Sequence, residues 1–299
     1  MPEAVRNPWR EAALAGDRVR YSRIVMGVDL FPWQVSMLAS EAKRKVADAS
    51  RQAGKSSVVA PIATHTAKYK RGSLTIVQAA TLQQASWDMS KIKVCIGRDS
   101  TYPLRTRESD SLIELDNGSR IEVIPATEKS AQGASAPAVI ILDEASDIED
   151  EVISAGVVPM LNNNPTCELI LISTPHGRTG FFFRAFNNRG WERYLIRSPY
   201  TPLSGTILER WREEAPWQAE QAAIGVRAWF SPRHMDLGEQ TEQLLLMGVR
   251  LYLQENGAEF IEPEEQLFSY EDIRSAAETP DLVESLPEGI AIEDIPVLE

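Results

Sequence analysis

The segment from Ala49 to Ser56 contains the residue types that bind nucleotide phosphates. Its sequence is Ala-Ser-Arg-Gln-Ala-Gly-Lys-Ser, and it lies between a predicted strand at 44–49 and a helical pattern at 54–68. Backbone N–H groups and a helix N-terminus in such a loop can bind phosphate oxygens. Lys55 would reach the β- and γ-phosphates, and the Ser56 hydroxyl would bind Mg²⁺. Glycine usually stands at the position of Ala49, and an ordinary helix start with a solvated lysine is the alternative interpretation.

Two acidic residues follow the most apolar run of the sequence. Residues 138–142 are Ala-Val-Ile-Ile-Leu and lead directly into Asp143 and Glu144, as expected for a strand that is buried on both faces. A phosphate-loop enzyme needs one acid to hold hydrated Mg²⁺ and another to orient the attacking water, which are natural roles for Asp143 and Glu144. Either acid could instead cap a helix, but the carboxyl ends of parallel strands meet in one crevice, which favours a site shared with Lys55.

Two shorter segments could complete the same site. In Phe31-Pro-Trp-Gln34, ahead of the phosphate loop, the Gln34 amide could contact an adenine edge; a core aromatic pair is the alternative. Ser173 and Thr174 end a predicted strand, where their hydroxyls could sense the γ-phosphate. Alternatively, they only terminate that strand ahead of Pro175.

Alternating strand and helix patterns would position these residues. The predicted strands are 44–49, 74–80, 138–142, 168–173 and 192–196, and the first helices are 54–68 and 82–96. This order predicts an α/β fold with a mainly parallel sheet covered by helices. A hairpin is predicted at 111–124, with its turn at Asp116-Asn-Gly118. Helical patterns at 207–230 and 241–255 predict a small helical subdomain.

Composition is that of a globular protein with an acidic end. The chain has 299 residues, 43% hydrophobic and 25% charged, and a net charge of -12. From residue 255 onward there are 14 acidic residues and only Arg274 as a base, so the preceding body, with 30 basic and 29 acidic residues, is almost neutral. We therefore expect a core at 1–198, a lid at 199–258 and an acidic tail or linker at 259–299. Small basic groups such as Lys43-Arg44-Lys45 could contact a phosphate backbone or simply be solvated.

Nothing in the sequence predicts a membrane span or a secretory signal, because no apolar run approaches the length of about 20 residues that a bilayer requires. The two cysteines, Cys95 and Cys167, are too few for a disulfide framework, and we expect buried thiols in a reducing compartment. The cytoplasm is the expected location.

The motifs together resemble the large terminase subunit of tailed bacteriophages. The resemblance rests on Ser50-Arg-Gln-Ala-Gly-Lys-Ser56, Val139-Ile-Ile-Leu-Asp-Glu-Ala145, Leu171-Ile-Ser-Thr-Pro-His-Gly177 and Phe31-Pro-Trp-Gln34, in this order and spacing. The hairpin around Asn117-Gly-Ser119 and the stretch at 259–268 extend it over most of residues 28–274. It implies a P-loop NTPase core of the RecA-like (ASCE) type, which hydrolyses ATP with Mg²⁺.

The resemblance also implies partners and roles. A terminase motor moves double-stranded DNA into a procapsid through the portal protein, acts with a small terminase subunit, forms a homo-oligomeric ring on the portal, and works in the host cytoplasm. By resemblance, Arg51 acts near the phosphates beside Lys55 and Glu144, and Ser173, Thr174 and Pro175 couple hydrolysis to movement. The nucleotide contacts carried over are Gln34, Ser50, Arg51, Gln52, Ala53, Gly54, Lys55, Ser56 and Ser57.

Two departures from the family pattern leave questions open. Gln132 precedes Gly133 where these terminases often have an arginine that acts on a neighbouring subunit's nucleotide. The arginine finger is therefore unassigned; its candidates are Arg51, Arg105, Arg107 and Arg120, any of which could equally be a surface residue. We also expect no nuclease site, because the acidic residues from Glu255 onward are scattered among Pro and Ser.

Two other functions fit parts of the pattern. A helicase-like DNA-dependent ATPase also uses a glutamine, a phosphate loop and an Asp-Glu motif, but it needs a second motor domain. A nucleotide-binding assembly protein without turnover is the other alternative, although the presence of both Lys55 and Glu144 argues against it.

Overall fold

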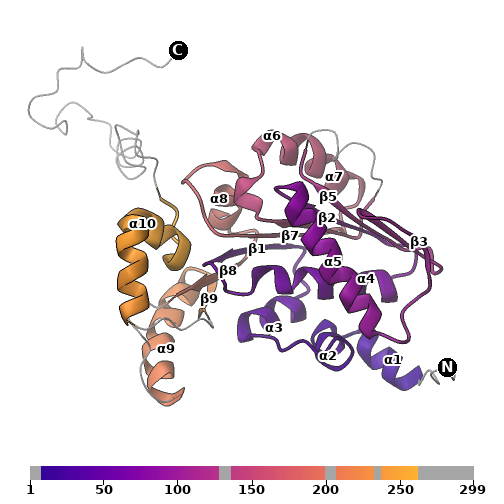
Figure 1. Ribbon diagram of the computed structural model, residues 1–299, viewed down its shortest axis with the longest axis horizontal. Helices are drawn as coiled ribbons and strands as arrows, with labels where there is room; N and C mark the ends of the chain where they lie inside the picture. The colour runs from indigo at the N-terminus through magenta and orange to yellow at the C-terminus, as the bar shows by residue number, and fades with distance from the viewer. Residues whose placement is uncertain (1–7, 128–135, 199–206, 232–236, 262–299) are drawn as a thin grey trace, which may run out of the picture. The chain divides into compact units, whose positions relative to one another are not determined.

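A nine-stranded sheet forms the centre of the protein (Figure 1). The computed structural model describes residues 8–127, 136–198, 207–231 and 237–261, all within one compact unit. Neighbouring strands follow the order β3-β4-β5-β2-β6-β7-β1-β8-β9. The strands are β1 (Arg44–Ala49), β2 (Leu74–Ala79), β3 (Arg105–Glu108), β4 (Leu112–Leu115), β5 (Arg120–Pro125), β6 (Val139–Asp143), β7 (Glu168–Ser173), β8 (Glu192–Arg197) and β9 (Val226–Phe230).

Strand pairing is parallel from β5 to β9 and antiparallel only where β4 pairs with β3 and β5. This confirms the predicted mainly parallel sheet and the hairpin. Between β1 and β6, which carry the two main motifs, lies β7. The carboxyl ends of these three neighbouring strands therefore meet at one edge of the sheet.

Helices cover both faces of the sheet, as Figure 1 shows. Side chains alternate between faces along a strand: Ala47 and Ile141 pack into the core beneath α2 to α5, and Val46 and Ile140 pack into the core beneath α6 to α8. The helices are α1 (Pro8–Ala15), α2 (Arg18–Ile24), α3 (Pro32–Ala39), α4 (Val59–Tyr69), α5 (Leu82–Arg98), α6 (Asp150–Val152), α7 (Val158–Asn163), α8 (Gly180–Asn187), α9 (Ile207–Ala223) and α10 (Leu237–Gly257). Two short 3₁₀ turns, η1 (Lys55–Ser57) and η2 (Ala145–Asp147), and a π-helical turn, η3 (Ile153–Val157), complete the described elements.

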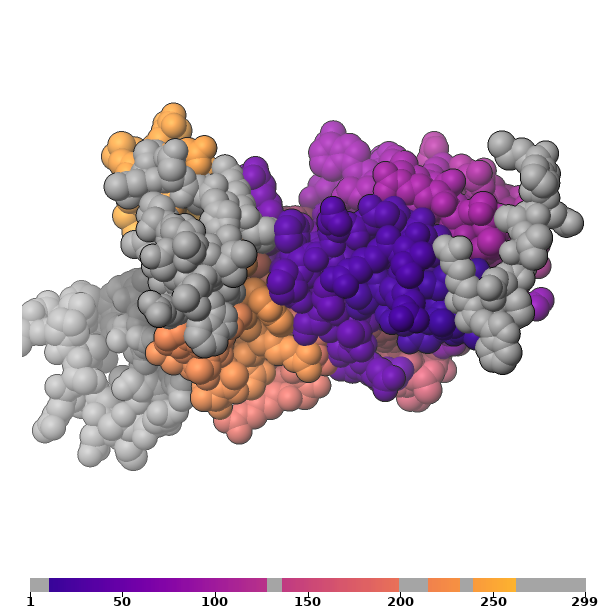
Figure 2. All heavy atoms as spheres, turned by 90° about the horizontal axis from the view of Figure 1, so that it is seen from below, coloured from indigo at the N-terminus to yellow at the C-terminus, as the bar shows by residue number. Residues whose placement is uncertain are grey.

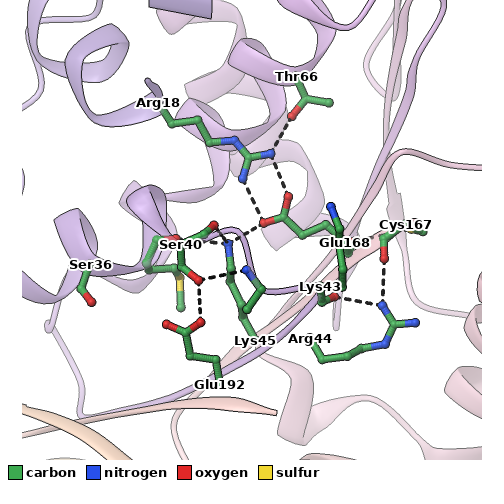
Figure 3. Close-up of polar contacts among 12 residues, drawn as sticks. Arg18, Ser36, Ser40, Lys43, Arg44, Lys45, Thr66, Cys167, Glu168 and Glu192 are labelled. Atoms are coloured by element: carbon green, nitrogen blue, oxygen red, sulfur yellow. Dashed lines mark hydrogen bonds and ion pairs between the residues drawn. The ribbon is translucent and has the colours of Figure 1, made fainter. Parts of the chain in front are cut away.

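The N-terminal helices are fixed to the sheet by a buried ionic cluster (Figure 3). Glu168, the first residue of β7, accepts two hydrogen bonds from the Arg18 guanidinium of α2, at 2.9 and 2.8 Å. It also accepts one from Lys45 Nζ of β1 at 2.7 Å. Burial lowers the pKa of Lys45, although Glu168 opposes the shift. Burial alone would raise the pKa of Glu168, but the Arg18 and Lys45 contacts bring it below its ordinary value.

This cluster lies at the amino ends of β1 and β7, at the opposite edge of the sheet from Glu144 and Thr174. Figure 2, seen from below, shows the indigo N-terminal segment as a continuous part of the molecular face. The cluster therefore holds α2 and the start of two central strands together, away from the candidate site.

One element differs from the sequence prediction. Residues 207–230 were expected to be helical throughout, but α9 ends at Ala223 and residues 226–230 form β9, parallel to β8. Gly225 has a φ of 75°, a conformation that ends the helix. Trp229 then stacks on Tyr194 of β8 with ring centroids 5.9 Å apart, so aromatic packing against the sheet outweighs the helical pattern.

Three features discussed for the sequence lie outside the described residues. They are the Gln132-Gly133 pair, the first residues of the expected lid at 199–206, and the acidic segment from residue 262 onward. Within the described part of the chain, no helix is both long and apolar enough to cross a membrane. Both Cys95 and Cys167 are buried free thiols, as predicted.

Candidate nucleotide-binding site

Residues from three adjacent strand ends converge at Lys55. The Lys55 side chain is only 8% exposed. Its Nζ donates to the Ala49 carbonyl at 3.3 Å and to Thr174 Oγ1 at 3.1 Å, and it lies 3.6 Å from Glu144 Oε1. The strand order produces this meeting, because β1, β7 and β6 end beside one another. The structure thus brings together the phosphate-loop lysine, the acid and the threonine that the sequence singled out separately.

The phosphate loop requires glycine at position 54. Gly54 has a φ of 86°, and a Cβ there would lie 2.7 Å from Gln34 Nε2. Below the loop, Gln34 Nε2 donates to the Gly54 carbonyl at 2.9 Å, and Trp33 Nε1 donates to the Ala53 carbonyl at 3.0 Å. The Gln34 Oε1 atom accepts from the Phe31 amide. Phe31-Pro-Trp-Gln34 therefore supports the backbone of the loop, and a contact between Gln34 and adenine stays a prediction.

Glu144 occupies a strained backbone conformation at the pocket rim. Its φ of 53° and ψ of 51° lie in the left-handed region, which non-glycine residues rarely adopt outside functional sites. Its Oε2 accepts a hydrogen bond from the Ser173 hydroxyl at 3.3 Å. The turn that follows is tied to β7 as well, because Ser146 Oγ lies 2.6 Å from Ser173 Oγ and donates to the Thr174 carbonyl at 2.6 Å. The acidic loop and the predicted coupling residues form one hydrogen-bonded unit.

Asp143 is buried at the base of the site. Burial, followed by the nearby Asp88 and Glu144 carboxylates, raises the pKa of Asp143 to about 7, while Lys91 and a hydrogen bond with Ser56 oppose the shift. Its Oδ1 atom accepts no hydrogen bond from any described residue. A buried carboxylate oxygen without a donor, next to a hydroxyl oxygen, suits Mg²⁺, which prefers oxygen ligands. Ser56 and Asp143 therefore fit the predicted cation.

Arg51 contacts the helical part of the chain. Its guanidinium forms an ion pair and two hydrogen bonds with the buried carboxylate of Glu255 in the last turn of α10. The backbone repeats this contact, because the Arg51 amide donates to the Glu255 carbonyl at 2.7 Å and the Ser198 amide to the Asn256 carbonyl at 2.7 Å. The end of α10 is thus docked directly on the phosphate loop.

A second acid and a histidine line the pocket beside Glu144. His176 Nδ1 lies 2.8 Å from Asp147 Oδ1. The hydrogen bond to Asp147 raises the pKa of His176 against the opposing effect of burial, and the charges of Asp147, Glu255 and Glu144 add to the rise. This pair links the turn after Glu144 to the segment after Thr174.

These groups surround a pocket of about 560 Å³. Its lining residues are Arg51, Gln52, Gly54, Lys55, Ser56, Ser57, Gln84, Lys91, Glu144, Asp147, Thr174, His176 and Glu255. Sequence reasoning named the phosphate loop, Glu144 and Thr174 among them. It missed Gln84 and Lys91 of α5, Asp147, His176 and Glu255. His176 does lie within a motif that carried the resemblance, whereas Glu255 is more than two hundred residues from Arg51 and no sequence signal connects them.

Other predicted residues lie elsewhere. Arg105, Arg107 and Arg120 lie on β3 and β5, on the far side of β2 from the phosphate loop. All three are exposed. Among the four arginines considered, Arg51 alone lines the pocket. Ser50, Ala53, Asp143, Ser173 and Pro175 lie behind the pocket wall as buried residues.

Comparison with solved structures gives the fold. Neither a protein-family model nor a curated protein matches the chain. The ATPase domain of the large terminase from Thermus phage P74-26 matches with a TM-score of 0.60 and 20% identity, over 80% of this chain and 97% of that domain. An arginine-to-alanine mutant of that domain matches equally well. This chain has the fold of a large-terminase ATPase domain.

A complete large terminase from a thermophilic bacteriophage also matches, with a TM-score of 0.50 and 9% identity. That match covers 78% of this chain but only 53% of the longer terminase. The P-loop NTPase fold predicted from the sequence is therefore confirmed, with the phosphate loop, the acidic pair and the coupling residues at the carboxyl edge of the sheet.

Proposed function

We propose that this chain is the ATP-hydrolysing motor part of a viral large terminase, which moves double-stranded DNA into a procapsid. The observation that carries the proposal is the convergence of Lys55, Glu144 and Thr174 in one pocket of a terminase-like fold. A fold alone does not fix an activity, but a buried lysine beside a strained glutamate and a phosphate-sized pocket is the arrangement that phosphoryl transfer needs.

The chain's own residues have distinct roles in this reaction. Lys55 neutralises charge on the transferred phosphate, and Glu144 accepts a hydrogen bond from the attacking water and orients it. Ser56 and Asp143 would hold Mg²⁺, which when bound neutralises charge on the phosphate oxygens. Arg51 is close enough to the loop to contribute a further positive charge once it leaves Glu255.

Coupling to movement starts from the hydrogen bonds around Ser173. A γ-phosphate at Lys55 competes with Thr174 Oγ1 for the same ammonium group, and Thr174 is bonded through Ser146 to the turn after Glu144. The presence or loss of the phosphate can therefore bias two arrangements of this unit. Residues 1–198 would form the motor core, 199–258 the lid and 259–299 an acidic linker.

The partners follow from the terminase role. They are duplex DNA, the portal protein of the procapsid, a small terminase subunit and further copies of this chain in a ring. Packaging takes place at the portal in the host cytoplasm. An arginine from a neighbouring copy would complete the site.

Substitution of Lys55 and Glu144 tests the activity. We expect Glu144→Gln to lower ATP turnover by about 100-fold or more while ATP still binds, because only the water-orienting carboxylate is lost. Lys55→Ala should weaken both turnover and binding. Lys93→Ala is the matched control, because Lys93 lies on α5 and pairs with Glu108, outside the pocket lining.

The outcomes separate the alternatives. Full turnover in Glu144→Gln would contradict the assignment of this residue. Tight ATP binding without turnover in the wild-type chain, with duplex DNA present, would favour the nucleotide-binding assembly protein. Strand separation by the chain alone would favour the helicase-like ATPase.

A further inference from the structure

Asp88 of α5 lies against Asp143, although no nucleotide motif of the sequence includes it. Only 2% of Asp88 is exposed. Its carboxyl group is within hydrogen-bonding contact of the Asp143 carboxyl group. Lys91 Nζ approaches Asp88 Oδ1 at 3.3 Å from the next turn of the same helix. Two carboxyl groups from different elements, α5 and β6, thus meet behind the phosphate pocket.

The described residues do not satisfy these two acids. Oδ2 of Asp88 and Oδ1 of Asp143 are both buried and accept no hydrogen bond there. Burying two like charges side by side is costly unless a positive charge or donors compensate. The nearest compensation is Lys91, whose side chain is 46% exposed and which reaches one oxygen of Asp88.

A divalent cation would supply what is missing. Magnesium in nucleotide sites is held by one or two carboxylates, phosphate oxygens and several water molecules rather than by a protein cage. In agreement with this, the described part of the chain contains no group of three or more His, Cys, Asp and Glu side chains placed to hold a metal by themselves. The Ser56 hydroxyl, which contacts Asp143, brings the phosphate loop to the same place.

We propose that Asp88 is the second carboxylate of the cation site, supplying an oxygen to Mg²⁺ or to one of its water molecules beside Asp143 and Ser56. This inference rests on the proposed nucleotide-dependent function. Its competitor is a role for Asp88 in holding Lys91 over the pocket, which Lys91 also lines.

Equilibrium binding of a fluorescent ADP derivative to the full chain, titrated with Mg²⁺, tests the proposal without relying on turnover. We expect Asp88→Asn to raise the Mg²⁺ concentration for half-maximal binding by about tenfold or more, as for other residues around a metal. In EDTA the same variant should bind ADP no more weakly than wild type, because it removes a negative charge near the phosphates. Lys91→Met is the matched control and should not raise the Mg²⁺ requirement.

The results distinguish the possible failures. An unchanged Mg²⁺ requirement in Asp88→Asn, or an equal rise in Lys91→Met, would overturn the inference and leave the nucleotide site intact. A wild-type chain that binds no ADP at any Mg²⁺ concentration would overturn the proposed function together with it.

A measurement on the wild-type chain covers the case in which Asp88→Asn fails to fold. Fe²⁺ replaces Mg²⁺ in the ADP complex, and peroxide with ascorbate then generates radicals that cut the backbone next to the metal. We expect cuts near residues 56, 88 and 143, mapped by mass spectrometry. Cuts near 56 and 143 without any near 88 would contradict the proposal.

Discussion

At the residue scale, the site consists of side chains whose roles depend on one another. Lys55 is recognisable from the sequence because the Gly-Lys-Ser order is itself a constraint of the loop. Asp88 and Glu255 were not predictable, because each becomes relevant only through a contact made by the folded chain. Gln34 was placed near the site correctly, but its amide atoms bond Phe31 and Gly54, so the loop's backbone accounts for its presence.

Gly54→Ala tests the support of the loop. The new Cβ would lie 2.7 Å from Gln34 Nε2, and the φ of 86° would be strained. We expect a loss of about tenfold or more in nucleotide affinity, equivalent to about 1.4 kcal/mol. Gly72→Ala is the control, because Gly72 has a φ of 68° with nothing near its Cβ and lies outside the pocket lining. Equal affinities in the two variants would contradict this account of the loop.

The His176–Asp147 pair predicts a pH dependence of stability. Because the folded state raises the pKa of His176 above its ordinary value of 6.5, the stabilisation is fully present below pH 6.5. It is lost as the pH rises through the raised folded value. Unfolding free energies measured in denaturant from pH 5 to 9 should therefore differ between wild type and His176→Gln most at the acidic end. A difference that grows toward alkaline pH would contradict the sign.

At the element scale, the sheet's strand order creates the site. Hydrophobic runs and turn residues predicted the central strands and the hairpin, because those segments have one strong period and clear ends. They did not predict β3, whose four residues are all exposed and carry no apolar pattern. They assigned β9 to a helix, because only its packing on β8 and the conformation of Gly225 distinguish it.

The ionic cluster at the amino edge predicts the largest stability effect. Glu168→Gln would leave Lys45, whose side chain is fully buried, without its carboxylate partner. We expect a loss of about 3–5 kcal/mol in the free energy of unfolding, as for other broken buried pairs. Glu108→Gln, which breaks exposed pairs with Lys93 and Arg105, should cost no more than about 1 kcal/mol. Chemical denaturation of both variants checks the contrast, and equal losses would contradict it.

At the scale of the whole molecule, the helical part reaches the nucleotide site directly. The end of α10 bonds to the phosphate loop through two backbone contacts and the Arg51–Glu255 pair. Events at the phosphates can therefore reach α10 without an intermediate element. Separate recognition of a core and a helical part was possible from composition, but their contact was not, since it joins segments about two hundred residues apart.

The central claim is that this fold turns over ATP as a DNA-dependent, multi-subunit motor. ATP hydrolysis measured against protein concentration, with and without duplex DNA, tests it most directly. We predict turnover that increases more steeply than protein concentration and is stimulated by duplex DNA, because a neighbouring copy completes the site. Turnover strictly proportional to concentration and indifferent to DNA, or no turnover while ATP remains bound, would contradict the account.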